Sequence, residues 1–147
     1  MKHIITLSIF LATLGLQAQQ NVPEDDFQNI EDKVIDWRRD LHENPELSNR
    51  EFETAKKIAA HLKSLGIETT TEIAKTGVVG ILKGDKPGKT LALRADIDAL
   101  PVTEKNDLEF KSTKTTEFLG SQTGVMHACG HDTHTAILMG VAEILSK

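Results

Sequence analysis

Residues 67–96, IETTTEIAKTGVVGILKGDKPGKTLALRAD, decide the fold class, because short apolar runs separated by turn residues replace the helical spacing found on either side. Runs rich in Thr, Ile, Val and Leu at 67–73, 77–82 and 90–95 predict β-strands. The Gly- and Pro-containing turn at 84–88, between the second and third runs, predicts a hairpin. We therefore expect a layer of strands in the middle of the chain.

Helical spacing precedes these runs. Apolar residues at steps of three and four predict an amphipathic helix, namely Phe27, Ile30, Val34, Trp37 and Leu41. Asn44-Pro45 predicts its end, because the residue before a proline avoids helical geometry. Ser48 and Glu51 form a capping-box pattern that predicts the start of a second helix, and Gly66 predicts its end.

A third helix is predicted near the end of the sequence. Asp132 or Thr133 can cap it, and its apolar residues keep helical spacing at Ile137, Leu138, Val141, Ile144 and Leu145. Residues 101–124 are polar and Thr-rich and predict an irregular loop. The order helix, helix, strands, loop, helix predicts an α/β domain with a mixed sheet flanked by helices.

Composition limits the classes of function. The 147 residues suffice for about one domain, and 39% hydrophobic with 27% charged residues is typical of a globular protein. A formal net charge of -5 and an aromatic content of 4% argue against a nucleic-acid partner, which needs a basic face or stacking platforms.

The first residues predict a secretory signal peptide. The apolar run 4–16 is too short to span a bilayer, which takes about 20 residues, and a small residue, Ala18, follows it. We expect a signal peptide at 1–18, a linker at 19–26 and an exported domain at 27–147; a buried N-terminal helix is the alternative. With Cys129 as its single cysteine, the chain cannot form an internal disulfide.

The densest group of reactive side chains is Met126-His127-Ala128-Cys129-Gly130-His131-Asp132-Thr133-His134. Thiolate and imidazole suit zinc and related divalent ions, so Cys129 and His131 are candidate metal ligands. Asp132 can accept a hydrogen bond from a ligand histidine and orient its ring. Two alternatives stay open: a buried cysteine beside a capping Asp132, and a redox-active thiol.

A second candidate group follows the last apolar run of the strand region. Asp96 and Asp98 share one face of an extended segment, where two carboxylates can bind a metal or hold a histidine. Arg94 would moderate their repulsion. An ordinary salt bridge at a strand end is the alternative. His42, near the end of the first predicted helix, is favourable to the helix dipole, which favours a structural role.

Together these segments resemble the M20 metallopeptidase family, in particular its amidohydrolase branch of hippurate hydrolases, aminoacylase-like enzymes and auxin-conjugate hydrolases. The resemblance is carried in order and spacing by Arg38-Arg39-Asp40-Leu41-His42 with Asn44-Pro45-Glu46-Leu47-Ser48, by Leu93-Arg94-Ala95-Asp96-Ile97-Asp98-Ala99-Leu100-Pro101, and by Met126-His127-Ala128-Cys129-Gly130-His131-Asp132.

The resemblance implies a zinc-peptidase-like α/β catalytic domain that binds two divalent ions, with Zn, Mn, Co or Ni as the candidates. Cys129 matches a bridging thiolate ligand and His131 a ligand to one ion. Asp96 matches an acidic residue that elsewhere in the family orients a metal-binding histidine, whose position Arg94 occupies here. The implied reaction is hydrolysis of N-acyl amino acids or small peptides by a metal-activated water, in a full-length protein that can dimerise through an inserted domain.

In the family, a pair of glutamates and two further histidine ligands follow the cysteine-histidine motif. We expect this chain to be the N-terminal portion of such an enzyme and to be inactive alone. A non-catalytic remnant with weak metal binding is the alternative, and a redox protein built on Cys129 is a third.

Overall fold

A computed structural model describes residues 23–147, so the predicted signal peptide lies outside the described residues. Residues 23–147 form three helices, α1 (Glu24–Glu43), α2 (Phe52–Ser64) and α3 (His131–Leu145). They also form four strands, β1 (Glu68–Ile73), β2 (Gly77–Ile81), β3 (Thr115–Phe118) and β4 (Ser121–Gly124). The predicted α/β class is confirmed.

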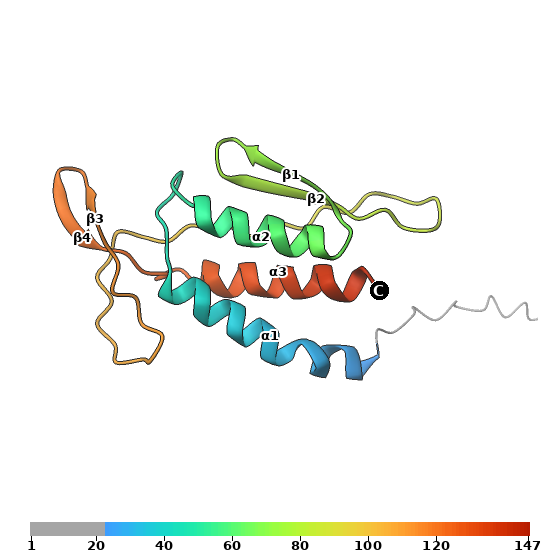
Figure 1. The fold of residues 1–147 in the computed structure, drawn as a ribbon, viewed down its shortest axis with the longest axis horizontal. Coiled ribbons are helices and arrows are strands. Elements are labelled where there is room, and N and C mark those ends of the chain that lie inside the picture. Colours follow the sequence, from blue (N-terminus) through green and yellow to red (C-terminus); the bar gives the residue numbers. More distant parts are fainter. Residues whose placement is uncertain (1–22) are drawn as a thin grey trace, which may run out of the picture.

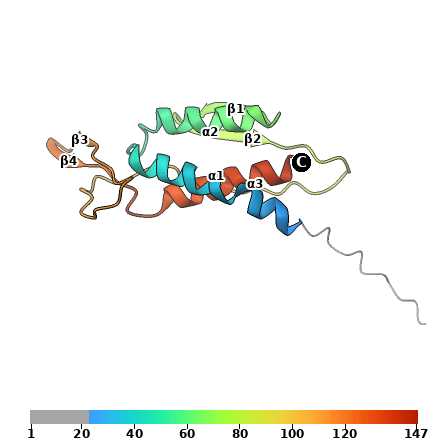
Figure 2. The same cartoon turned by 60° about the horizontal axis from the view of Figure 1, so that its bottom comes forward.

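The helices form one layer in which α3 lies between α1 and α2 (Figure 1). The β1–β2 hairpin packs along α2, while β3 and β4 project from one end of the helical layer (Figure 2). Gly140 on α3 permits close packing against α1, because a Cβ at this position would lie 2.9 Å from Cγ2 of Val34. Ala136 and Met139 on the same helix are buried in this layer.

Helix α1 begins at Glu24, inside the predicted linker and three residues before Phe27. Its first turn carries Glu24, Asp25 and Asp26, whose negative charges are favourable at the positive end of the helix dipole. The helix ends at Glu43 with Asn44 as its C-cap, as the Asn-Pro pair predicts. None of the helices in residues 23–147 is both long and apolar enough to cross a membrane.

The predicted capping box of α2 is wrong. Ser48 lies in a turn that precedes the helix, where Asn49 takes the left-handed conformation (φ 63°). The carboxylate of Glu46 instead accepts hydrogen bonds from the backbone N–H groups of Glu53 (3.2 Å) and Thr54 (2.8 Å). Glu51 is buried and accepts a hydrogen bond from the Thr76 hydroxyl (2.8 Å), so it connects α2 to the β1–β2 turn.

The predicted end of α2 is confirmed, because Gly66 follows the helix in the left-handed conformation (φ 74°). Strands β1 and β2 then pair antiparallel, with Glu68 opposite Ile81. The hairpin predicted at 84–88 and the strand predicted at 90–95 are wrong: residues 82–98 contain no strand. Within the described residues β2 pairs with β1 along one edge only, and no strand pairs with the 90–95 run.

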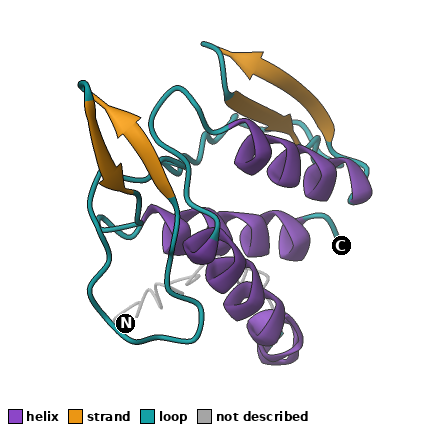
Figure 3. Cartoon of the chain, turned by 60° about the vertical axis from the view of Figure 1, so that its left-hand side comes forward, coloured by secondary structure: helices purple, strands orange, loops and turns teal. Residues whose placement is uncertain are grey.

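The irregular loop predicted at 101–124 is also wrong in part. It contains the antiparallel β3–β4 hairpin, whose turn residues Leu119 and Gly120 both have positive φ, 52° and 78° (Figure 3). Positive φ at both positions matches the right-handed twist of hairpin strands. Within residues 23–147 the strands form two separate antiparallel pairs in place of one mixed sheet, and a parallel bridge joins Leu47 to Ala99.

Helix α3 begins at His131, one residue before the earlier of the two predicted caps. Gly130 is the N-cap in the left-handed conformation (φ 83°), and its carbonyl oxygen accepts hydrogen bonds from the N–H groups of Thr133 and His134, both at 3.1 Å. Asp132 therefore sits inside the first turn, where its side chain is free to bond elsewhere.

Candidate metal-binding site

The start of α3 is where the three sequence segments meet. Leu100 and Met126 exchange backbone hydrogen bonds of 3.0 and 3.1 Å. The N–H of Ala99 donates to the carbonyl oxygen of Glu46 (2.7 Å). A small core of Leu47, Ala99 and Val125 buries this junction. Segments that lie far apart in sequence thus surround one helix N-terminus.

His131 is held by Asp98. Its Nδ1 lies 3.0 Å from Oδ1 of Asp98 and 3.0 Å from the carbonyl oxygen of the same residue. Two acceptors at Nδ1 fix the proton there, so Nε2 keeps its lone pair, and within residues 23–147 it has no hydrogen-bond partner. A carboxylate behind one ring nitrogen is the usual arrangement for a histidine that binds metal through the other. The sequence left open whether Asp96 and Asp98 bind a metal or hold a histidine. The second alternative is confirmed for Asp98.

Cys129 lies in the turn before α3, and its side chain is exposed and free. It and His131 are two residues apart at the same helix start. Among residues 23–147, no group of three or more His, Cys, Asp and Glu side chains is placed to hold a metal ion. The two predicted ligands are therefore available, but the described residues do not complete a coordination shell around them.

Asp96 lies apart from this pair. Its Oδ1 accepts hydrogen bonds from Nε (3.0 Å) and Nη2 (2.5 Å) of Arg94, in a pair whose side chains are 45% and 85% exposed. Within the described residues Asp96 contacts α3 through its backbone, whose carbonyl oxygen accepts the Thr135 hydroxyl (3.1 Å). The Arg94–Asp96 salt bridge is the alternative that the sequence left open.

A charged cluster borders the turn, and the sequence does not predict it: Arg38–Asp132–His42–Glu104, in which His42 and Asp132 are buried and Arg38 is partly exposed. We call it the buried charged cluster, after its centre. Oδ2 of Asp132 lies 2.8 Å from Nδ1 of His42 and 3.0 Å from Nε of Arg38. Nε2 of His42 lies 2.8 Å from Oε1 of Glu104. The prediction that Asp132 orients a ligand histidine is wrong: Asp132 contacts His42, and the candidate ligand His131 is held by Asp98. Glu104, in a segment predicted to be irregular, gave no signal.

The electrostatics of Glu104 follow from its partners. Burial acts to raise the pKa of this carboxyl, but hydrogen bonds from His42, Ser112 and Asn106 and the charge of His42 outweigh burial. The pKa of Glu104 consequently lies below its ordinary value, and the group is a carboxylate at neutral pH.

The burial of His127 is the second feature that the sequence does not predict, although the sequence places this histidine in the cluster 126–134. Its ring is buried, and neither ring nitrogen has a hydrogen-bond partner within the described part of the chain. Burial lowers the pKa of His127 to about 4; the charge of Asp132 opposes this effect, and those of His42 and His131 add to it. Unpaired buried nitrogens mark a place that takes a further polar group, such as a water or an ion. The free Nε2 of His131 and the exposed thiol of Cys129 are donors of the kind that suits a divalent transition metal, and the described residues bring no third donor to them.

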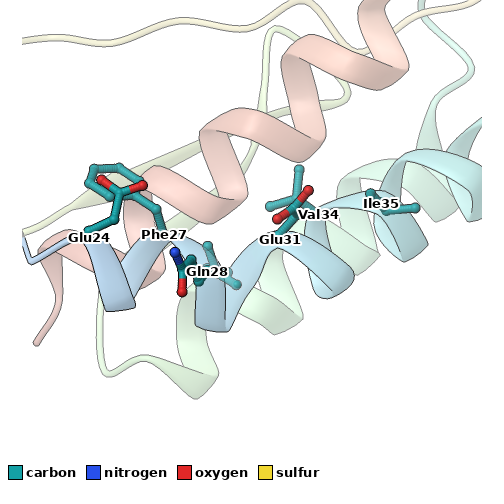
Figure 4. A pocket seen from close by; sticks show the side chains of 7 residues that line it. Glu24, Phe27, Gln28, Glu31, Val34 and Ile35 are labelled. Carbon is teal, nitrogen blue, oxygen red and sulfur yellow. The ribbon is translucent and has the colours of Figure 1, made fainter.

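A shallow depression of about 350 Å³ lies elsewhere, along the N-terminal half of α1 between Glu24 and Ile35 (Figure 4). None of the candidate site residues lines it. This depression is therefore separate from the candidate site at the start of α3.

Much of the chain is similar to known proteins. Residues 92–147 match the model of peptidase family M20/M25/M40. The chain is 53% identical over 125 residues to thermostable carboxypeptidase 2 of Saccharolobus solfataricus and 46% identical over 118 residues to an N-acyl-L-amino acid amidohydrolase of Geobacillus stearothermophilus. These alignments cover 84% and 80% of this chain, but 30% of each relative.

A solved structure shows the same fold. The YXEP protein of Bacillus subtilis, described as a dinuclear metal-binding peptidase of family M20, superposes with a TM-score of 0.71 at 45% identity. The superposition covers 81% of this chain and 31% of that protein. The chain thus spans about 30% of the length of the relatives it matches.

Proposed function

We propose that this chain supplies Cys129 and His131 to the metal centre of an amidohydrolase of peptidase family M20/M25/M40, whose model matches residues 92–147. The observation that carries the proposal is the fixed ring of His131, whose Nδ1 is held by Asp98 at 3.0 Å while Nε2 stays available. The neighbouring thiol of Cys129 provides the second donor.

The chemistry of the proposed centre needs two divalent ions, with Zn, Mn, Co and Ni as the candidates. When bound, such ions polarise an amide carbonyl and generate a nucleophile from water near neutral pH. In this chain Cys129 and His131 would bind the ions, and Asp98 would orient His131. Asp96 stays a weaker candidate for a catalytic role, because its carboxylate is engaged by Arg94 at the surface.

The proposed substrates are N-acyl amino acids or small peptides, and the products would be a carboxylic acid and an amino acid. The names of the relatives, a carboxypeptidase and an N-acyl amino acid amidohydrolase, support this class. Four-coordinate sites need more donors than the described residues bring together. We therefore expect the 147-residue chain alone to show no measurable hydrolysis of hippurate or N-acetyl amino acids.

Weak metal binding without catalysis is the second candidate function, favoured by the incomplete shell of ligands. Alkylation of the Cys129 thiol, measured with and without zinc, tests metal binding directly. We expect zinc to slow alkylation, and we expect His131→Asn to remove most of this protection. His134→Asn, a substitution of an exposed histidine one turn further along α3, is the matched control. Equal alkylation rates with and without zinc would reject both the amidohydrolase and the weak metal-binding function. That result would favour a redox protein built on Cys129.

We also propose that the protein is exported. The apolar run at 4–16 followed by Ala18 supports this location. Expression in a bacterial host and mass measurement of the product test it: removal of about 18 residues is expected, and an intact N-terminus would contradict it.

A further inference from the structure

The buried charged cluster is centred on His42, a residue that plays no part in the proposed metal chemistry. Both ring nitrogens of His42 face carboxylate oxygens at 2.8 Å, from Asp132 on one side and Glu104 on the other. A carboxylate oxygen only accepts hydrogen bonds, so the ring of His42 acts as the donor between Asp132 and Glu104. Arg38, whose side chain is 34% exposed, adds a guanidinium to Asp132 at the edge of the cluster.

The cluster joins three parts of the fold. Arg38 and His42 come from the last turns of α1, and Asp132 is the second residue of α3. Glu104 also accepts hydrogen bonds from the N–H of Ser112 and from Nδ2 of Asn106, which closes the 104–112 loop. The 104–112 loop is further fixed by Phe110, whose ring lies beneath Arg38 at 5.1 Å and in T-shaped contact with His42 at 5.6 Å.

Asp132 links this cluster to the proposed ligands. It is 1% exposed, directly follows His131 in the chain, and follows the Cys129-Gly130 turn by two residues. The first turn of α3 has no side-chain cap. Its direction is therefore set by the contact of Asp132 with His42 and Arg38 and by that of His131 with Asp98.

We propose that His42 is a positioning residue for the metal site: through Asp132 it fixes the first turn of α3 and hence the direction of Nε2 of His131 and of the Cys129 thiol. This inference rests on the proposed function, because it takes Cys129 and His131 as the ligands. Loss of a residue that orients a metal ligand typically lowers metal affinity by roughly 10- to 100-fold.

The test compares His42→Gln with Glu51→Gln, a substitution in the Glu51–Thr76 contact. Glu51 is buried to the same degree as His42 (both 4% exposed) but lies between α2 and the β1–β2 turn. Cobalt affinity is measured in the full chain from the thiolate-to-cobalt absorption band, at a temperature where circular dichroism shows both variants folded. We expect His42→Gln to weaken cobalt binding by about 10-fold or more and Glu51→Gln to leave it within about twofold of the unsubstituted chain. Equal affinities of the two variants would overturn the proposal.

A second measurement does not depend on metal. Long-range ¹H–¹⁵N correlation spectra report which nitrogen of His131 carries the proton. In the unsubstituted chain we expect the proton on Nδ1, and in His42→Gln a mixture of both tautomers. If the unsubstituted chain lacks the cobalt band, the proposed function fails; an unchanged tautomer in His42→Gln would then overturn the positioning role separately.

Because His42→Gln leaves two buried carboxylates short of a partner, it can prevent folding. Asp132→Asn is the second variant, since its amide oxygen still accepts from His42 and Arg38 without the charge. A folded Asp132→Asn chain is expected to bind cobalt several-fold more weakly. Unchanged cobalt affinity with an unchanged His131 tautomer in this variant would overturn the proposal as well.

Discussion

His127 and His131 show how differently two histidines four residues apart are used. His131 is oriented by Asp98 and keeps one nitrogen available, whereas His127 is buried with neither nitrogen paired in the described residues. The sequence marks both as part of one cluster, because residue type and spacing are all it contains. Which histidine faces a carboxylate depends on the Leu100–Met126 pairing, a long-range contact that no local pattern predicts.

The environment of His127 predicts a pH dependence of stability. Its pKa of about 4 in the folded protein lies below the ordinary value near 6.5, so the unfolded chain takes up the proton first. The free energy of unfolding should be highest above about pH 6.5 and fall by up to about 3 kcal/mol as pH decreases to about 4. Urea unfolding at a series of pH values measures this slope.

His127→Gln is the matched control for that slope. Glutamine does not titrate, so the variant should lose most of the change between pH 6.5 and 4. The charges facing His127, on Asp132, His42, His131 and Asp98, stay in place in the variant. An identical slope in both proteins would show that other groups cause the dependence.

Asp98 and Asp96 provide a second test at the residue scale. The alternation of side chains predicts that both lie on one face. In the structure only Asp98 contacts the His131 ring, whereas Asp96 is paired with Arg94. Asp98→Asn should weaken zinc binding about 10-fold or more, because the carboxylate no longer fixes the His131 tautomer. Asp96→Asn should leave zinc affinity nearly unchanged. Calorimetric titration of both variants measures the difference, and the opposite order would assign the orienting role to Asp96.

At the scale of elements, the sequence predicts the helices better than the strands. Helical spacing repeats over several turns, so α1, α2 and α3 are found within a few residues of their predicted bounds. Strand pairing depends on partners elsewhere in the chain. The 90–95 run has strand composition, yet Leu91 and Leu93 are 80% and 54% exposed, and the run pairs with nothing in the described residues.

The start of α2 offers a prediction that separates local pattern from structure. Glu46→Ala should lower the free energy of unfolding by about 1 kcal/mol, because two backbone N–H groups at the helix start lose their acceptor. Ser48→Ala should change it by less than about 0.5 kcal/mol, as expected for a surface residue that caps nothing. Denaturant unfolding of the two variants measures which residue caps α2, Glu46 or Ser48. A larger decrease in the free energy of unfolding for Ser48→Ala than for Glu46→Ala would contradict the structure and support the predicted capping box.

At the scale of the whole molecule, three segments from different parts of the sequence surround one helix N-terminus. The family resemblance predicts that these segments belong to one site. The ion pairs among them could not be predicted, because they depend on contacts that only the folded structure shows. The chain also exposes a set of large apolar side chains on and after β2, namely Val79, Ile81, Leu82, Leu91 and Leu93. Exposed apolar side chains of this kind are expected to bind hydrophobic dyes.

Dye binding tests that description of the surface. Replacing both Leu91 and Leu93 with lysine should lower the fluorescence of bound anilinonaphthalene sulfonate. The substitutions should change the free energy of unfolding by less than about 0.5 kcal/mol each, because the side chains are exposed. A marked loss of stability would mean that these leucines are packed in solution.

X-ray absorption of the zinc-loaded protein tests the central claim most directly, namely that Cys129 and His131 bind the same metal centre. The predicted spectrum contains one sulfur at about 2.3 Å and nitrogen or oxygen at about 2.0–2.1 Å. The sulfur contribution should disappear in Cys129→Ser, and the imidazole scattering should decrease in His131→Asn. A zinc ion surrounded only by oxygen and nitrogen in the unsubstituted protein would contradict the account.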